Sequence, residues 1–312
     1  MPQQRLLVRG VDMNGIIKFR AYQEEVFWAK WRMMFWLWRR QAGKSFTLAN
    51  WAIRRMMERE NHLVTMVSAS VNLGGELLLK EAQVWRTVLA AYKTKCELKT
   101  SADDDRGELL DIDAIADLFE HNKLEARIYH SDTSFSRTRV IAPNPDTAVG
   151  WTGDILIDEC GRIPNFKDVY EAILPIMDSN PDFCLIAATT PPPDEKHYSY
   201  EMFLPPEQEW AHNPKGNWYL SPSGIMAHRL DAWDGELAGA KYFHPHSQKR
   251  EIITADMHRE LAFDKVAWDR NHAVKFIADT TAAVRLADIQ RAMVLGDGCC
   301  FDTYASEEVT AV

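Results

Sequence analysis

Short apolar runs alternate with stretches of helical periodicity along the first part of the chain. The unbroken apolar run at residues 33–38 predicts a buried strand, and apolar residues at helical spacing predict a helix at residues 45–59. The same succession recurs as a strand at residues 63–67 and a helix at about residues 76–92. The chain is therefore expected to begin with two strand-helix units.

Three further apolar runs predict strands at residues 138–142, 155–157 and 184–188, the last of which is stopped by three consecutive prolines. Short apolar strands separated by helices are typical of a parallel sheet that is covered on both faces. We therefore predict an α/β fold with a mostly parallel central sheet flanked by helices.

The pattern weakens after Pro193. Residues 194–224 are rich in Pro, Asn, Tyr and Trp and are expected to be irregular, whereas residues 225–230 predict a further strand. Residues 257–276 predict a helix followed by a short strand, and residues 277–291 predict an amphipathic helix.

Composition restricts the class of protein. The 312 residues include 36 Lys and Arg against 45 Asp and Glu, a net charge of -9, which excludes a basic protein that coats nucleic acid. Five cysteines without C-x-x-C spacing predict reduced thiols in a cytosol. The densest apolar run has six residues, far fewer than the roughly 20 that cross a bilayer, so we expect no membrane association.

The charge is unevenly distributed. The first 60 residues hold 12 Lys and Arg against 5 Asp and Glu, whereas residues 101–120 hold 8 acids and a single arginine. We interpret the acidic stretch as a solvated surface insertion.

The segment WRRQAGKS, from Trp38 to Ser45, matches the phosphate-binding (Walker A) pattern G-x-x-x-x-G-K-[ST] except that Trp38 stands at the first glycine. It lies between a predicted strand and a predicted helix, which is the context that the motif requires. Lys44 would reach the β- and γ-phosphates of ATP, and Ser45 would ligate Mg²⁺. The other predicted ATP-binding residues of the loop are Arg39, Gln41, Ala42 and Gly43. The alternative is an ordinary helix N-terminus that carries Lys and Ser.

Two adjacent carboxylates, Asp158 and Glu159, end the buried strand at residues 155–157 and form a candidate Walker B motif. Ligands of open α/β sheets bind at the carboxyl ends of the strands. Asp158 would hold the metal ion, and Glu159 would orient and deprotonate the attacking water. Acidic turn residues without function are the alternative.

Three other elements could complete the site. Arg39 and Arg40 could neutralise charge on the transferred phosphoryl group, or could be a surface pair. Thr189 and Thr190 end a strand and could report hydrolysis to the next segment, although a plain strand-to-turn junction fits equally well. The amide of Gln23 could read adenine, or the residue could belong to an amphipathic helix.

This set of motifs, in this order, resembles the N-terminal packaging ATPase domain of the large terminase subunit of tailed bacteriophages. The resemblance rests on Tyr22-Gln23, on the loop from Arg39 to Ser45, on the strand ending in Glu159 and on Ala188-Thr189-Thr190-Pro191. It implies a P-loop NTPase of the additional-strand catalytic glutamate (RecA-like) type with a small lid subdomain.

The resemblance also implies the roles of individual residues. Arg40 would be a cis arginine finger and, with Lys44 and Glu159, a catalytic residue. Gln23 would read adenine, Asp158 would belong to the metal site with Ser45, and Thr189 with Thr190 would be the coupling motif. ATP and Mg²⁺ are the implied cofactors.

The domain organisation departs from the family pattern. Large terminase subunits normally continue into an RNase H-like nuclease domain, which needs several clustered carboxylates. We therefore predict a P-loop ATPase domain with its lid at residues 1–276, a linker or truncated tail at residues 277–312, and no nuclease activity.

The leading hypothesis is an ATP-hydrolysing motor that translocates double-stranded DNA into a procapsid in the cytoplasm of a bacterial host. The implied partners are the portal protein, the small terminase subunit and other copies of the chain in a ring. A helicase-type or remodelling P-loop ATPase and a non-hydrolysing prophage remnant are the alternatives.

Overall fold

The computed structural model describes residues 16–100, 119–121, 124–131, 133–148 and 151–277. By its internal contacts the chain divides into two compact units, Met1–Phe276 and Ile277–Val312. The predicted helix at residues 277–291 and most of the acidic stretch lie outside the described residues. The assignment of an ATPase domain to the first unit stays a prediction.

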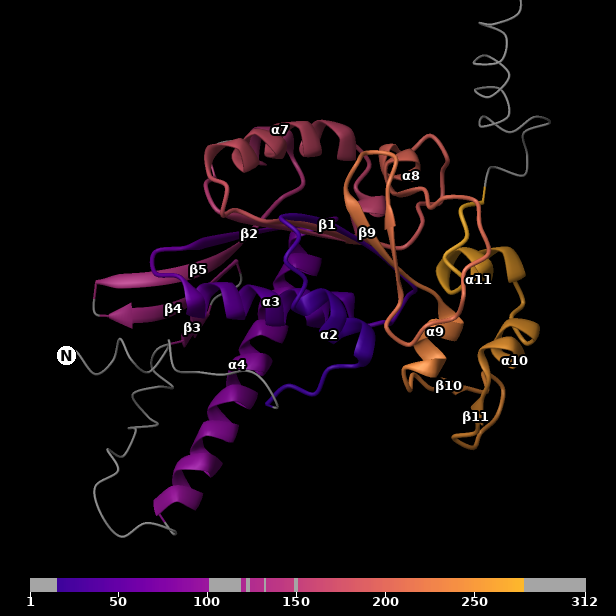
Figure 1. Cartoon of the computed structure of the whole chain (residues 1–312), viewed down its shortest axis with the longest axis horizontal. Coiled ribbons are helices and arrows are strands. Elements are labelled where there is room, and N and C mark those ends of the chain that lie inside the picture. Colours follow the sequence, from indigo (N-terminus) through magenta and orange to yellow (C-terminus); the bar gives the residue numbers. More distant parts are fainter. Residues whose placement is uncertain (1–15, 101–118, 122–123, 132, 149–150, 278–312) are drawn as a thin grey trace, which may run out of the picture. The chain divides into compact units, whose positions relative to one another are not determined.

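Within the described residues, nine strands form one sheet in the order β3-β4-β5-β2-β6-β7-β1-β9-β8 (Figure 1). The strands are β1 (Met33–Trp38), β2 (Leu63–Ser68), β3 (Phe119–His121), β4 (Glu125–Ser131), β5 (Ser134–Ile141), β6 (Asp154–Asp158), β7 (Leu185–Thr189), β8 (Asn217–Leu220) and β9 (Met226–Leu230). The pairs from β5 to β9 are parallel, and the pairs at the two edges are antiparallel. The predicted α/β class and its mostly parallel sheet are therefore confirmed.

Helices cover both faces of the sheet. The longer helices are α2 (Ala21–Phe27), α3 (Lys44–Glu58), α4 (Val71–Thr100), α7 (Phe166–Ser179) and α11 (Lys265–Asn271). The shorter ones are α6 (Pro145–Ala148), the 3-10 turn η1 (Cys160–Arg162), α8 (Tyr198–Phe203), α9 (Ala232–Leu237) and α10 (Ala255–Glu260). Figure 1 shows α3 and α4 on one side of the sheet and α7 on the other. Among the helices that the structure describes, none combines the length and the apolar composition needed to cross a bilayer.

Strand β1 explains how the two layers are formed. Its alternate residues point to opposite faces of the sheet. Trp36 and Trp38 join the apolar cluster that contains residues of α2, α3 and α4, whereas Phe35 and Leu37 join the cluster that contains residues of α7 and α8. All four side chains are fully buried, as expected for a strand in the middle of a covered parallel sheet.

A smaller apolar cluster lies after β9, at residues 232–273. It joins α9 to α10, to α11 and to a separate pair of antiparallel strands, β10 (Tyr242–Phe243) and β11 (Ile252–Ile253). We call residues 232–273 the lid; that they form the predicted small lid subdomain stays a prediction.

Two local expectations were wrong. Residues 194–224 are not wholly irregular, because they contain α8 and the edge strand β8. Residues 257–276 form no single helix and strand: α10 ends at Glu260, and Asp264 then caps α11 by accepting a hydrogen bond from the N–H of Ala267 at 2.8 Å. A side-chain cap of this kind starts a new helix.

A buried ion cluster ties the amino ends of the central strands to α3. The carboxylate of Asp154, which is fully buried at the start of β6, accepts two hydrogen bonds from Arg55 at 2.6 and 2.9 Å. It also contacts Nε2 of His62 at 2.6 Å and accepts the N–H of Cys184 at 2.8 Å. The one carboxylate thus connects α3 and β6 with the residues that directly precede β2 and β7.

Glu81 of α4 is fully buried, and this burial raises the pKa of its carboxyl group well above the ordinary value. Its protonated form is therefore favoured in the folded protein, and the stability it contributes is lost as the pH rises from the unfolded pKa towards the folded one. We predict that Glu81→Gln raises the free energy of unfolding at pH 8 relative to the wild type. The expected gain is about 1.4 kcal/mol for each pH unit by which the pH exceeds the unfolded pKa, up to the folded pKa. Urea unfolding at pH 5 and pH 8 checks this, since the gain should be larger at pH 8. An equal effect at both pH values would contradict it.

Candidate functional site

The loop between β1 and α3 has the backbone conformation of a tight turn before a helix. Gly43 has φ of 81° and precedes Lys44, the first residue of α3, and Gln41 also has a positive φ of 55°. A Cβ on Gly43 would lie 2.7 Å from Nε2 of Gln23, the end of a flexible side chain that can shift, so it is the left-handed conformation that favours glycine here. The first N–H groups of α3 lack acceptors within the helix, which favours an anion at this end.

Trp38 occupies the place of the first glycine of the motif and anchors the loop. Its ring stacks on Trp36 at 5.1 Å and meets Tyr22 edge to face at 5.1 Å. Its Nε1–H donates to Nδ1 of His228 at 2.8 Å. The hydroxyl of Tyr22 donates to the carbonyl of Ala42 at 2.9 Å, which fixes the far side of the loop. Large packed side chains thus hold a turn that glycine forms in the standard motif.

The structure brings the two predicted motifs together at the carboxyl edge of the sheet. Nζ of Lys44 lies 3.2 Å from Oε1 of Glu159. The hydroxyl of Ser45 donates to Oδ2 of Asp158 at 2.8 Å, across 113 positions of sequence. Strand β1 leads into the loop and β6 leads to the acids, and one strand, β7, lies between them in the sheet. The predicted fold type has an additional strand at this position.

The two acids differ in environment. Burial, followed by the neighbouring charge of Glu159, raises the pKa of Asp158, whereas Lys44 and Ser45 act in the opposite direction. Among the described residues, Oδ1 of Asp158 and Oε2 of Glu159 are buried and have no hydrogen-bond partner. Glu159 follows its strand in a left-handed conformation, with φ of 53°. A hydroxyl and a carboxylate with an unpartnered oxygen are the donor type that Mg²⁺ prefers, so these residues fit that ion.

Thr189 connects the end of β7 to the turn after Glu159. Its buried hydroxyl accepts the N–H of Gly161 at 3.0 Å and donates to the carbonyl of Thr190 at 2.7 Å. Thr190 is also buried, 3% exposed. Both predicted coupling residues therefore lie next to Gly161, in the turn that follows Glu159, and Thr189 is hydrogen-bonded to that turn.

Gln23 lies next to the loop, and its side-chain oxygen already accepts a hydrogen bond. Its side chain is 5% exposed, and its Oε1 accepts the N–H of Arg20 at 3.0 Å at the start of α2. The expected amphipathic helix is present as α2, whereas the expected reading of adenine by Gln23 stays a prediction.

The two arginines of the loop point to different surroundings. Arg39 is 5% exposed, and its guanidinium lies over the ring of Tyr242 at 5.1 Å and donates to the carbonyl of Arg40 at 3.1 Å. Arg40 is exposed, and its backbone N–H donates to the carbonyl of Asn271 at 2.8 Å. The loop therefore contacts the lid at α11 and β10. The catalytic role of Arg40 stays a prediction.

A pocket of about 270 Å³ lies between the loop and the lid. Its lining residues are Arg20, Arg39, Gln41, Ala240, Lys241, Tyr242, Phe243, His258 and His272. Burial, and then the charge of Arg39, lower the pKa of His272 to about 4, so its ring is neutral at pH 7. Sequence analysis did not predict the lid residues of this pocket, because neither their spacing nor their types form a motif.

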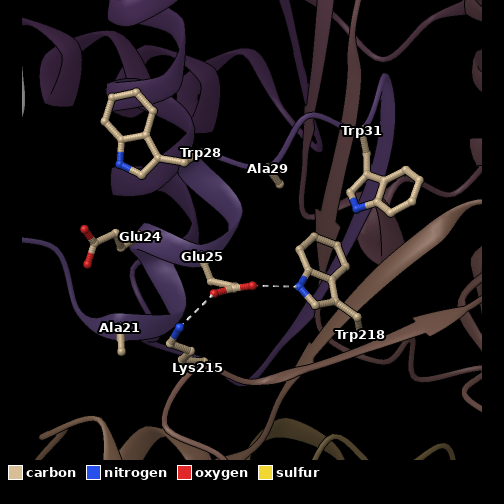
Figure 2. A pocket seen from close by; sticks show the side chains of 8 residues that line it. All are labelled: Ala21, Glu24, Glu25, Trp28, Ala29, Trp31, Lys215 and Trp218. Atoms are coloured by element: carbon tan, nitrogen blue, oxygen red, sulfur yellow. Dashed lines mark hydrogen bonds and ion pairs between the residues drawn. The ribbon is translucent and has the colours of Figure 1, made fainter.

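A second pocket, of about 420 Å³, is lined by α2 and β8 and contains three tryptophans (Figure 2). Trp28 and Trp31 are 39% and 50% exposed. Figure 2 shows Glu25 between Lys215, at 3.6 Å, and Nε1 of Trp218, at 3.3 Å. None of the described residues that line this pocket belongs to the predicted ATP site.

Comparison with known proteins supplies an independent view of the fold. No protein-family model matches the chain, and no curated protein sequence matches it. Among solved structures, a mutant of the large terminase ATPase domain of Thermus phage P74-26 matches with a TM-score of 0.52 and 17% identity, over 87% of this chain and 97% of that domain.

The large terminase of a second, thermophilic bacteriophage matches with a TM-score of 0.51 and 12% identity, over 84% of this chain. The chain spans about half of that protein, since 54% of its length is covered. Identities this low establish the architecture alone. The resemblance expected from the motifs is therefore confirmed at the level of the fold: the described chain has the fold of the ATPase domain of phage large terminases.

Proposed function

We propose that the chain is the ATP-hydrolysing motor domain of a DNA-packaging terminase. The observation that carries the proposal is the convergence of Lys44 with Glu159, at 3.2 Å, and of Ser45 with Asp158, at 2.8 Å, at one edge of the sheet. The shared fold with phage terminase ATPase domains supports it.

The phosphates of ATP would lie at the N-terminus of α3, where the N–H groups of Gly43, Lys44 and Ser45 attract negative charge. Ser45 and Asp158 would hold Mg²⁺, which when bound neutralises charge on the phosphates. The ammonium group of Lys44 would then leave its ion pair with Glu159 and pair with the phosphate oxygens instead. Nucleotide binding would thus free the carboxylate of Glu159 from its ion pair, so that it could orient and deprotonate water.

The base and ribose of ATP would occupy the 270 Å³ pocket between the loop and the lid. The aromatic ring of Tyr242 and the neutral ring of His272 offer surfaces on which a purine can stack. Because Tyr242 belongs to the lid, occupancy of this pocket would draw the lid towards the loop.

The structural change that follows hydrolysis would be transmitted through hydrogen bonds that connect the acids and the loop to neighbouring elements. The hydroxyl of Thr189 bonds the N–H of Gly161, two residues after Glu159, and the N–H of Arg40 bonds Asn271 of the lid. A change in the position of Glu159 or Arg40 would therefore move β7 or α11. Arg40 would also stabilise charge on the transferred phosphoryl group.

The partners follow from this function. Double-stranded DNA would be bound through its phosphates, without regard to sequence. A ring of copies docked on a portal protein, with a small terminase subunit, would raise the avidity of a chain whose net charge is -9. Assembly would take place in the cytoplasm of the bacterial host.

We predict phosphate release from ATP by the purified chain that depends on Mg²⁺ and increases when double-stranded DNA is added. EDTA should reduce the rate to background, and addition of excess Mg²⁺ should restore it. Lys196→Ala, a substitution of an exposed lysine far along the chain from the loop, serves as the control and should behave as the wild type.

Two outcomes would favour the alternatives. Unwinding of a forked duplex would indicate a helicase-type ATPase. Nucleotide binding without any release of phosphate, in the presence of DNA and Mg²⁺, would indicate a non-hydrolysing remnant and would contradict the motor.

A further inference from the structure

Strands β4 and β5 present three arginines on the face of the sheet opposite α3 and α4. Residues next to the arginines on the same strands join the apolar cluster that contains residues of α3 and α4; these are Ala126, Ile128 and Val140. The side chains of Arg127, Arg137 and Arg139 are 36%, 34% and 41% exposed. Figure 1 shows β4 and β5 extending past the end of α7, the helix that covers this face at the middle of the sheet. We call these three side chains the arginine face.

The register of the strands sets like charges against each other. Arg127 lies directly opposite Arg137, and Glu125 lies opposite Arg139. Like charges at directly opposite positions destabilise a sheet. Among the ion pairs that the structure describes on these strands, the carboxylate of Glu125 contacts all three guanidinium groups, at 2.6, 3.5 and 3.8 Å.

Arg137 and Arg139 are the less neutralised members of the arginine face. Glu125 lies 2.6 Å from Arg127 but 3.5 Å from Arg137 and 3.8 Å from Arg139. On the side of β2, Arg137 and Arg139 are in register with Leu63 and Thr65, which carry no charge. The positive charge is thus concentrated on β5.

Two of the three guanidinium groups lie over aromatic rings. Arg139 lies over the ring of Trp151 at 4.8 Å, and Arg127 lies over the ring of Phe135 at 5.0 Å. Phe135 in turn contacts Tyr129, its cross-strand neighbour, at 5.5 Å between ring centroids. A guanidinium stacked on a ring keeps its edge N–H groups available, and these match the oxygens of a phosphate.

We propose that the arginine face, centred on Arg137 and Arg139, binds the phosphate backbone of double-stranded DNA. Within β4 and β5, three arginines against one glutamate leave an excess of positive charge that complements a polyanion. Two arginines on one face of a strand are about 6.6 Å apart, similar to the separation of successive phosphates along a DNA strand. No base-reading groups are involved, so binding is independent of sequence. The inference rests on the proposed function, because it assigns the DNA-gripping surface of that motor.

The arginine face is separate from the ATP site. Strand β5 pairs with β2, and β2 lies between β5 and β6, the strand that carries Asp158. Substitution of Arg137 and Arg139 can therefore test DNA binding without altering the groups proposed to hydrolyse ATP.

The test is fluorescence anisotropy of a labelled, arbitrary-sequence duplex with the full 312-residue chain, in a salt series from about 50 to 200 mM NaCl. The double variant R137Q/R139Q retains Arg127 as the partner of Glu125. We expect it to lose about tenfold or more in affinity, and the slope of log K against log salt to fall by about 2, since each lost phosphate contact removes about 0.9.

Two matched variants complete the design. K196Q/K249Q removes the same charge from exposed positions elsewhere and should leave affinity and slope within error of the wild type. R137K/R139K keeps the charge and should retain most of the salt slope, which separates loss of charge from a folding defect. Basal ATP hydrolysis should be the same in all three variants and the wild type.

Three results would overturn the proposal. The wild type could fail to bind the duplex at the lowest salt, or R137Q/R139Q and K196Q/K249Q could bind the duplex equally well. In the same assay with a labelled single strand, R137Q/R139Q could lose affinity for single-stranded DNA while its affinity for the duplex is unchanged. If the wild type hydrolyses no ATP but R137Q/R139Q still loses duplex affinity, the DNA surface stands and the ATPase proposal fails.

Discussion

Glu159→Gln is expected to lower kcat for ATP hydrolysis by about 10²–10⁴-fold while ATP still binds. The substitution keeps the size of the side chain and removes the carboxylate that would take a proton from water. Lys44, now 3.2 Å from Oε1 of Glu159, would lose its ionic partner and remain available to phosphate. Steady-state phosphate release measures kcat, and equilibrium binding of a fluorescent ATP analogue measures affinity.

A matched control is Glu171→Gln on α7. Glu171 is exposed and pairs with Lys167 at 3.9 Å, one turn along the same helix, so its loss should leave hydrolysis unchanged. Equal rates for Glu159→Gln and Glu171→Gln would show that the acid beside the loop does no chemistry, and the enzymatic interpretation would have to be abandoned.

Asp154→Ala is expected to lower the free energy of unfolding by about 3–5 kcal/mol, the cost of leaving a buried cation without its partner. The fully buried carboxylate of Asp154 has Arg55 at 2.6 Å and His62 at 2.6 Å, and the substitution leaves both groups buried without an acid. Urea unfolding followed by circular dichroism measures the loss. Asp182→Ala, at an exposed position that pairs with Arg59 at 3.7 Å, is the control and should cost less than about 1 kcal/mol.

The same cluster gives the wild type a pH dependence. Burial on its own would raise the pKa of Asp154, but hydrogen bonds from His62 and Arg55 outweigh it and hold the pKa below its ordinary value. A carboxyl group with a lowered folded pKa contributes stability above its unfolded pKa, near 3.9, and loses it as the pH falls through the folded pKa. Asp154→Ala should therefore weaken the fall in stability below about pH 4. An unchanged acid limb in the variant would assign that fall to other groups.

The central strands and the two motifs at their ends could be predicted from sequence because their signals are local. The run Met33–Trp38 is apolar on both faces, Asp158 ends β6 and Glu159 directly follows it, so each pattern is complete within a few residues. That Lys44 and Glu159 meet followed from the rule that parallel strands present their carboxyl ends at one edge.

Other parts depend on contacts that a local pattern does not contain. Helix α7 was not predicted, although Phe166, Val169, Tyr170 and Ile173 recur at helical spacing, and it continues through Pro175. The arginines of β4 and β5 form no motif in the sequence, and it is the strand register that sets Arg127 opposite Arg137.

The lid side of the ATP pocket and the buried ion cluster could not be predicted for the same reason. Tyr242 and His272 approach Arg39 only because the chain returns to the loop after β9. Arg55 and Asp154 are 99 positions apart and meet only in the folded sheet.

The continuity of the central sheet has a mechanical consequence. Strand β5 is hydrogen-bonded to β2, and β2 to β6, so Arg139 and Glu159 are linked by adjoining backbone ladders instead of a loop. Tension applied at Arg139 would load these ladders in shear, which many hydrogen bonds resist together. This part of the sheet would then move as a rigid unit, and force applied at Arg139 would reach the acids with little elastic stretching of the backbone.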